Sequence, residues 1–238
     1  MRARYGPSHR TYWTVLIARH TLNAMGLIAA LGLSALANAA LATPFTIESR
    51  NAISDLAAQT HTTSELALQL SVANIDRWDD AEVITALRTA ANLLAQCEIR
   101  ITGADLLRIS VPDSHRYFDT PRSRELARAL ALPKPTLYFT AGTRQVPAFD
   151  AEAIGRGNSR TRPELEDTVW IARGARDLGQ VIAHELAHVL MDSGAHDNTP
   201  GNLMAEQTSP QHTQLSAAQC AQMRNTGARN GLLRPGVD

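Results

Sequence analysis

Apolar residues recur with a helical period in two segments of this chain. In the segment 76–96 they stand three and four positions apart behind several acidic residues, which predicts a long amphipathic helix. The segment 178–192 is apolar over most of its length, and its flanking residues suit the two ends of a helix. We expect Asp177 to cap its first turn, with Gln180 in a variant of the capping box, and Gly194 to end it in a left-handed conformation.

Shorter runs rich in β-branched and aromatic residues predict strands. They are EIRITG at 98–103, LLRISVP at 106–112, TLYFT at 136–140 and TVWIA at 168–172. Further helical signals occur in AISDLAAQ at 52–59, SELALQLS at 64–71, the segment 123–130 and QLSAAQCAQMRN at 214–225. The segment 141–167 is long and rich in Gly, Pro, Arg and Asn, so we interpret it as a loop at the rim of a cleft. Helices and strands mixed in this order predict an α/β (α+β) domain.

Composition favours a single globular domain, since the 238 residues contain 44% hydrophobic and 19% charged residues. The formal net charge is zero, but residues 1–42 hold four arginines and no acidic residue. The remainder therefore carries 19 basic against 23 acidic side chains. A chain with this balance is not expected to bind nucleic acid.

Residues 1–42 have the three-part pattern of a secretory signal peptide. A basic region is followed by an apolar stretch and by two A-x-A sites, which place the cleavage after Ala39 or Ala42. We therefore expect an exported protein, periplasmic or extracellular, with one domain at 43–238. The alternative is that the apolar stretch is retained as a membrane anchor, since its length just suffices to cross a bilayer.

Export would also affect the interpretation of the segment after the signal peptide and of the two cysteines. Residues 43–75 either begin the fold or form a short pro-segment. Only two cysteines occur, Cys97 and Cys220, and neither belongs to a C-x-x-C pair. Because two thiols that meet in an exported protein usually form a disulfide, we predict a bond between Cys97 and Cys220.

The stretch HELAHVLMDSGAH at 184–196 contains the zinc-binding signature H-E-x-x-H inside the second predicted helix. His184 and His188 are four residues apart, so their imidazoles project from one face and can bind one ion at about 2.0–2.1 Å. In such sites a glutamate at the position of Glu185 takes a proton from a zinc-activated water and passes it to the leaving amine. The motif therefore predicts one catalytic Zn²⁺ and hydrolysis of a peptide bond.

HELAHVLMDSGAH, followed by NLM, resembles the metzincin clan of zincin metallopeptidases, whose usual pattern is H-E-x-x-H-x-x-G-x-x-H and then a methionine-containing turn. The resemblance implies that His196 is the third zinc ligand and that Met204 lies in the turn beneath the metal. The sequence departs from the pattern, since Met191 replaces the glycine and His196 stands eight residues after His188 instead of six. We interpret this as a two-residue insertion that lengthens the helix and moves its end to Gly194.

Three acidic residues are alternatives to His196 as the third ligand. Glu206 comes from a later segment, as the glutamate ligand does in zincins of the gluzincin type. Asp192 and Asp197 are closer to the motif, but Asp192 would place three ligands on one straight helix, where tetrahedral closure is difficult. Three other histidines are interpreted as solvated loop residues, namely His61, His115 and His212.

The resemblance also implies a fold in which a twisted mixed sheet packs on a long helix and on the active-site helix, with a helical C-terminal subdomain. TVWIA at 168–172 best matches the edge strand that binds an extended substrate by strand addition in this family. We therefore expect an exported zinc endopeptidase whose partner is a peptide or protein substrate. A zinc-binding or interaction protein without turnover, and a zinc hydrolase of a non-peptide amide, are the alternatives.

Overall fold

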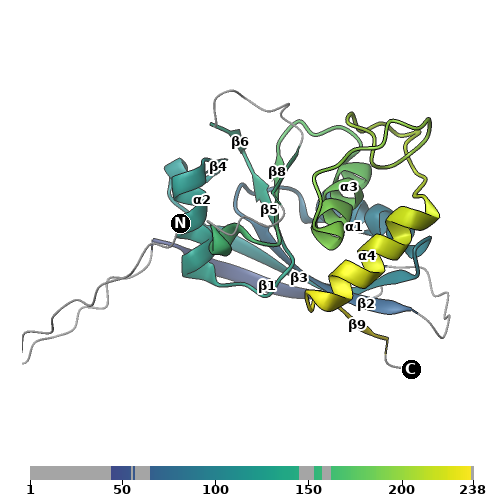
Figure 1. The fold of residues 1–238 in the computed structure, drawn as a ribbon. Helices are drawn as coiled ribbons and strands as arrows, with labels where there is room; N and C mark the ends of the chain where they lie inside the picture. The colour runs from purple at the N-terminus through teal and green to yellow at the C-terminus, as the bar shows by residue number, and fades with distance from the viewer. Residues whose placement is uncertain (1–43, 55, 57–64, 145–152, 157–161, 237–238) are drawn as a thin grey trace, which may run out of the picture. The chain divides into compact units, whose positions relative to one another are not determined.

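A mixed sheet runs through the part of the chain that the computed structural model describes, namely residues 44–54, 56, 65–144, 153–156 and 162–236. Its strands are β1 (Thr46–Ser54), β2 (Leu66–Asn74), β3 (Ile99–Ser110), β5 (Thr136–Thr140), β7 (Ala153–Arg156), β8 (Thr168–Ala172) and β9 (Leu233–Pro235). The order is β1-β3-β2-β5-β8-β7, with β9 paired to the start of β2. Figure 1 labels these strands except β7. Strands β2, β3, β5 and β8 are mutually parallel, whereas β1, β7 and β9 run antiparallel to their neighbours.

Helices cover both faces of this sheet. They are α1 (Asp80–Ala95), α2 (Thr120–Leu130), α3 (Leu178–Met191) and α4 (Ala217–Arg229), with short 3₁₀ turns at Asp113–His115 and Pro163–Leu165. A separate two-stranded ladder joins β4 (Tyr117–Phe118) to β6 (Gly142–Thr143). Helices α1 and α3 pack on one face with α4 against α3, and α2 packs on the other face. This mixture confirms the predicted α+β class.

Successive residues of the central strands point to opposite faces, so the sheet separates two apolar cores. Leu137 and Phe139 of β5 lie in the core beneath α1 and α3. Tyr138 between them lies in the core beneath α2, where its ring stacks on that of Trp170 with 4.0 Å between the centroids. Both strands are buried along their whole length, which explains why their residues other than the terminal threonines are apolar instead of alternating with polar ones.

Helix α3 is held between α1 and α4. A Cβ on Gly179 would lie 2.4 Å from Cβ of Thr89 in α1, so the close approach of the two helices requires a glycine in α3. On the other side α4 is tied to the end of α1 by a disulfide between Cys97 and Cys220, whose Cα atoms are 4.8 Å apart. The predicted pairing of the two cysteines is confirmed.

Four sequence-based strand and helix assignments are wrong. The first three residues of AISDLAAQ, expected to be helical, lie in β1. SELALQLS was expected to be helical but lies almost entirely in β2, because a short apolar run suits a buried central strand as well as a helix. EIRITG and LLRISVP are one continuous strand, β3, that ends before Pro112. TVWIA was expected at the edge of the sheet, but β8 pairs with β5 on one side and β7 on the other, so β7 is the edge strand.

The two ends of α3 also differ from the prediction. Asp177 precedes the helix in a left-handed conformation (φ 51°) and its side chain makes no capping hydrogen bond, so the expected capping box is wrong. The helix ends at Met191, and Asp192 takes the left-handed conformation (φ 50°) in place of Gly194, whose φ is not positive. The chain turns because Ser193 N–H donates to the carbonyl of His188 at 3.2 Å.

The proposed signal peptide at 1–42 lies outside the described residues, as do residues 145–152 and 157–161 of the predicted loop at 141–167. Among the residues that the structure does describe, no helix is long and apolar enough to cross a membrane.

Candidate metal centre

Three histidines converge at the C-terminal half of α3. The Nε2 atoms of His184 and His188 are 2.9 Å apart, and those of His188 and His196 are 3.3 Å apart. Within the described part of the chain, this is the one group of three or more His, Cys, Asp or Glu residues whose potential ligand atoms could share an ion, and these atoms all lie within 4.8 Å of one another. Two nitrogens bound to one tetrahedral zinc ion would be about 3.3 Å apart, so the spacing is that of a metal site.

The other ring nitrogens determine where the protons of these histidines are. Nδ1 of His184 lies 2.8 Å from the carbonyl oxygen of Leu203, and Nδ1 of His188 lies 2.7 Å from that of Ser193. Since a carbonyl oxygen only accepts, each Nδ1 must carry the hydrogen of the neutral ring. Both Nε2 atoms therefore present lone pairs to each other at 2.9 Å, an arrangement that a shared cation satisfies. The three imidazoles thus fit a metal ion.

Burial keeps the first two imidazoles in the neutral form that binds metal. His184 is 4% exposed and His188 is 8% exposed. Desolvation by burial lowers the pKa of His184, and the hydrogen bond to Leu203 opposes this only in part. Burial, followed by the neighbouring His184, lowers the pKa of His188 to about 4. At neutral pH both rings are uncharged donors of a lone pair.

Glu185 follows His184 in the same turn of α3 and is only 8% exposed. His196, by contrast, is exposed and comes from the segment that follows α3. The cluster therefore combines two buried ligand groups, a buried carboxylate beside them and one ligand group at the surface.

The acidic alternatives to His196 do not join the cluster. Asp197 directs its carboxylate to Thr199, whose backbone and hydroxyl groups donate to Oδ1 at 3.0 and 2.7 Å, and these hydrogen bonds lower its pKa. Neither Asp192 nor Glu206 is in the group of converging ligand atoms. His196 is brought to the other two histidines by the segment after Asp192, and not by a longer helix as predicted.

Met204 is fully buried in the core beneath α3. Its carbonyl oxygen accepts from Asp197 N–H at 2.8 Å, which pairs its segment with the one that carries His196. The preceding residue, Leu203, supplies the carbonyl that orients His184. The role of Met204 as a Met-turn residue stays a prediction, but its segment does contact the ligand groups.

Sequence reasoning missed the residues that orient the imidazoles. Leu203 and Ser193 act through backbone carbonyls, which leave no signature in the side-chain pattern. Asn202, the first residue of NLM, has no role in the sequence pattern, yet it is 5% exposed and its Oδ1 accepts from Met204 N–H at 2.8 Å. The one sequence signal for this role of Asn202 was the presence of a polar residue two positions before the methionine.

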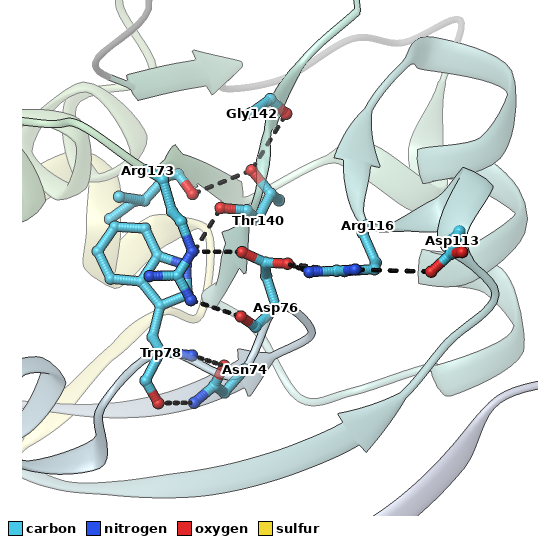
Figure 2. A network of polar contacts seen from close by, with 9 residues as sticks. Asn74, Asp76, Trp78, Asp113, Arg116, Thr140, Gly142 and Arg173 are labelled. Atoms are coloured by element: carbon cyan, nitrogen blue, oxygen red, sulfur yellow. Dashed lines mark hydrogen bonds and ion pairs between the residues drawn. The ribbon is translucent and has the colours of Figure 1, made fainter.

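A second polar cluster lies at the C-terminal ends of β2, β5 and β8 (Figure 2). Asp76 is 3% exposed, and its carboxylate accepts from Arg116 Nε at 2.7 Å and from Arg173 Nε. Arg173 also donates to the Asp76 carbonyl at 2.6 Å and lies over the ring of Trp78, 5.0 Å from its centroid. The contact with Asp76 raises the pKa of Arg116. The guanidinium groups of Arg116 and Arg173 therefore compensate the buried negative charge of Asp76.

No protein-family model and no curated protein matches this sequence. The architecture and the histidine cluster are together consistent with an α+β zincin-like domain. Among solved structures, the chain is similar to metalloproteinase-II from Bacteroides fragilis, with a TM-score of 0.50 and 14% sequence identity. The match covers 71% of this chain and 55% of that protein, so the chain spans about half the length of its structural neighbour.

Proposed function

We propose that this protein is an exported zinc-dependent peptidase that cleaves internal peptide bonds. The observation that carries the proposal is the convergence of His184, His188 and His196, whose Nε2 atoms surround one position. Zinc is the proposed ion, because three neutral imidazoles with a fourth position open are a ligand set of catalytic zinc sites. The likeness to a metalloproteinase fold supports this reading.

Glu185 is the proposed general base. A bound zinc ion would lower the pKa of a water molecule to about 7 and polarise the substrate carbonyl. Glu185 accepts the proton of the attacking water and delivers it to the leaving nitrogen as the peptide bond breaks. Its low exposure, 8%, keeps bulk water from competing for that proton. A site that only held a structural ion would need no carboxylate here.

The proposed substrate is an extended polypeptide. We assign its binding to β7, because this strand, and not TVWIA, is the last in the sheet and its outer edge can accept another strand. Strand addition recognises the peptide backbone, so it suits a peptidase better than a hydrolase of a non-peptide amide. Export is supported by the disulfide between Cys97 and Cys220, a bond typical of proteins outside the cytoplasm.

The test compares the wild-type protein with Glu185→Gln and His196→Ala for zinc content and for cleavage of casein. We expect Glu185→Gln to retain zinc and to lose activity by about 10²–10⁴-fold, the usual contribution of a general base. His196→Ala should lose both zinc and activity. The matched control is Glu206→Gln, the same chemical change at a residue outside the cluster, which should leave both unchanged.

Each alternative has its own outcome in this comparison. Loss of zinc in Glu206→Gln with full retention in His196→Ala would move the third ligand to Glu206. Stoichiometric zinc in a wild-type protein that cleaves neither casein nor a broad peptide library favours a binding protein without turnover. If the preparation that cleaves no peptide does hydrolyse a non-peptide amide, the protein is instead a zinc hydrolase of that class of substrate.

A further inference from the structure

A hydrogen-bonded pair of amides, Asn202 and Gln219, lies behind the segment that carries His196. Asn202 Nδ2 donates to Gln219 Oε1 at 3.2 Å, and Gln219 Nε2 donates back to Asn202 Oδ1 at 3.2 Å. Both nitrogens also donate to Oδ2 of Asp197, at 3.1 Å from Asn202 and 3.4 Å from Gln219. Asp197 is the residue directly after His196.

Backbone donors determine which way each amide is oriented. Met204 N–H donates to Asn202 Oδ1 at 2.8 Å, and Ser216 N–H donates to Gln219 Oε1 at 2.7 Å. Because a backbone N–H cannot accept, these two atoms must be oxygens, and the NH₂ groups must face Asp197. The pair therefore presents two donors to one carboxylate oxygen.

The capping of α4 explains the role of only one of the two polar side-chain atoms of Gln219, namely Oε1. Its Oε1 accepts from Ser216 N–H in a complete capping box, and a glutamate at this position would serve that purpose equally well. In the first turn of a helix the negative charge of a glutamate is even favourable. What requires an amide is Nε2, and its two partners, Asp197 and Asn202, belong to the segments around the histidine cluster.

We propose that Gln219 and Asn202 are positioning residues of the metal centre, which place His196 through Asp197 and His184 through Leu203. Asp197 N–H bonds the carbonyl of Met204, so one network joins the segment of the third ligand to the Met204 segment. Leu203, between Asn202 and Met204, supplies the carbonyl that orients His184. Groups that hold metal ligands by hydrogen bonds typically change metal affinity by 10–100-fold when they are mutated.

This inference rests on the proposed zinc site and is tested by zinc affinity, measured by competition with a chromophoric chelator. Gln219→Glu keeps the cap and the size of the side chain but turns the donor that faces Asp197 into an acceptor. Asn202→Asp makes the same change from the other amide. We expect each variant to lower zinc affinity by about 10-fold or more and to shift the d–d absorption spectrum of the cobalt-substituted protein.

The matched control is Gln222→Glu, on the same helix, whose Nε2 donates to the Met191 carbonyl at 3.1 Å and not to Asp197. It should retain wild-type affinity and spectrum. Wild-type affinity in Gln219→Glu overturns the inference alone, whereas a wild-type protein that binds no zinc overturns the proposed function as well. A lowered melting temperature of the zinc-free variant with an unchanged cobalt spectrum assigns Gln219 to fold stability and also overturns the inference.

Discussion

The two polar clusters of this molecule handle buried polar groups in opposite ways. Asp76 is surrounded by donors, so its negative charge is matched by two guanidinium groups within hydrogen-bonding distance. His184 and His188 instead point lone pair at lone pair, with their hydrogens committed to backbone carbonyls on the far sides of the rings. The first cluster is complete as it stands, whereas the second has the arrangement that a shared cation would satisfy.

This difference separates a structural polar cluster from a functional one. A buried charge that is fully paired joins strands and contributes to folding, and nothing about it invites a ligand. By contrast, two buried acceptor atoms that face each other with no hydrogen between them are unfavourable. The rest of the fold must hold them in place, at some cost in stability. Substitutions in the two clusters should therefore have different consequences.

The largest effect is expected from His188→Ala, which removes the central imidazole of the cluster. Loss of one of three ligands should lower zinc affinity by more than about 100-fold, since even outer hydrogen-bond partners contribute 10–100-fold. The melting temperature of the zinc-free protein should hardly fall, because the substitution also removes a pair of opposed lone pairs. Zinc titration and thermal unfolding of the metal-free protein measure the two effects. Equal losses in affinity and in metal-free stability would abolish the distinction between the clusters.

The converse experiment breaks the Asp76 cluster. Replacing both Arg116 and Arg173 by alanine leaves a carboxylate that is buried and uncompensated, which should lower the free energy of unfolding by about 3–5 kcal/mol. Zinc affinity of the molecules that remain folded should be unchanged. Urea unfolding measures the first quantity, and chelator competition at low temperature measures the second. A loss of zinc affinity without a loss of stability would show that this cluster serves the metal centre.

Acid should affect the histidine cluster in a defined pH range. The pKa of His188 in the folded protein, about 4, lies below its ordinary value of 6.5, so the unfolded chain takes up this proton first as the pH falls. The free energy of unfolding is therefore highest above pH 6.5 and decreases by about 3 kcal/mol as the pH falls towards 4, because protonation of this ring favours the unfolded chain. Urea unfolding of the zinc-free protein between pH 7 and 4 measures it. His188→Ala should show a weaker dependence, and an identical one would contradict the assignment.

The smallest effect on stability is expected at Asp167. This residue is a half-buried acid, but its charge is less well compensated than that of Asp76. Burial, then the charge of Glu166, raises the pKa of Asp167 to about 6, and its buried Oδ1 receives no hydrogen bond from the described residues. A folded pKa above the ordinary 3.8 means that the ionised form destabilises the fold at neutral pH. Asp167→Asn should therefore stabilise the protein by about 1 kcal/mol at pH 7, after allowance for solvent screening of a half-buried group. The gain should vanish below about pH 4, and a gain that persists there would refute this explanation.

Local chemistry explains which parts of the site could be predicted. The spacing of His184 and His188 on one helix face needs only the geometry of an α-helix, and α3 begins where the apolar pattern indicated. The pairing of Cys97 with Cys220 followed from their number and from the expected compartment. The position of His196 was inferred from a family pattern with two residues too many, and the structure brings it to the other histidines by a different route.

The errors have a common physical origin. SELALQLS was predicted to be helical because a short apolar run has no periodicity that distinguishes a helix from a strand. Its pairing with β3 and β5 makes it a strand. The four-residue strand β7 lies in a segment that was read as loop, since its pairing with β8 is a long-range contact. Asp192 adopts the left-handed turn that was assigned to Gly194, because the helix end is decided by where the following segment must go.

The amino-acid sequence was sufficient to place two histidines and a glutamate of the candidate site on one helix, since their relation depends on bonds and dihedral angles within a few residues. The fold alone brought His196 to that pair, oriented the imidazoles on the carbonyls of Leu203 and Ser193, and set Gln219 of α4 behind them. The longest of these relations, between Asp197 and Gln219, joins residues 22 positions apart, and together they link α3, the segment after it and α4. They arise from packing and hydrogen bonding between segments, which no local pattern encodes.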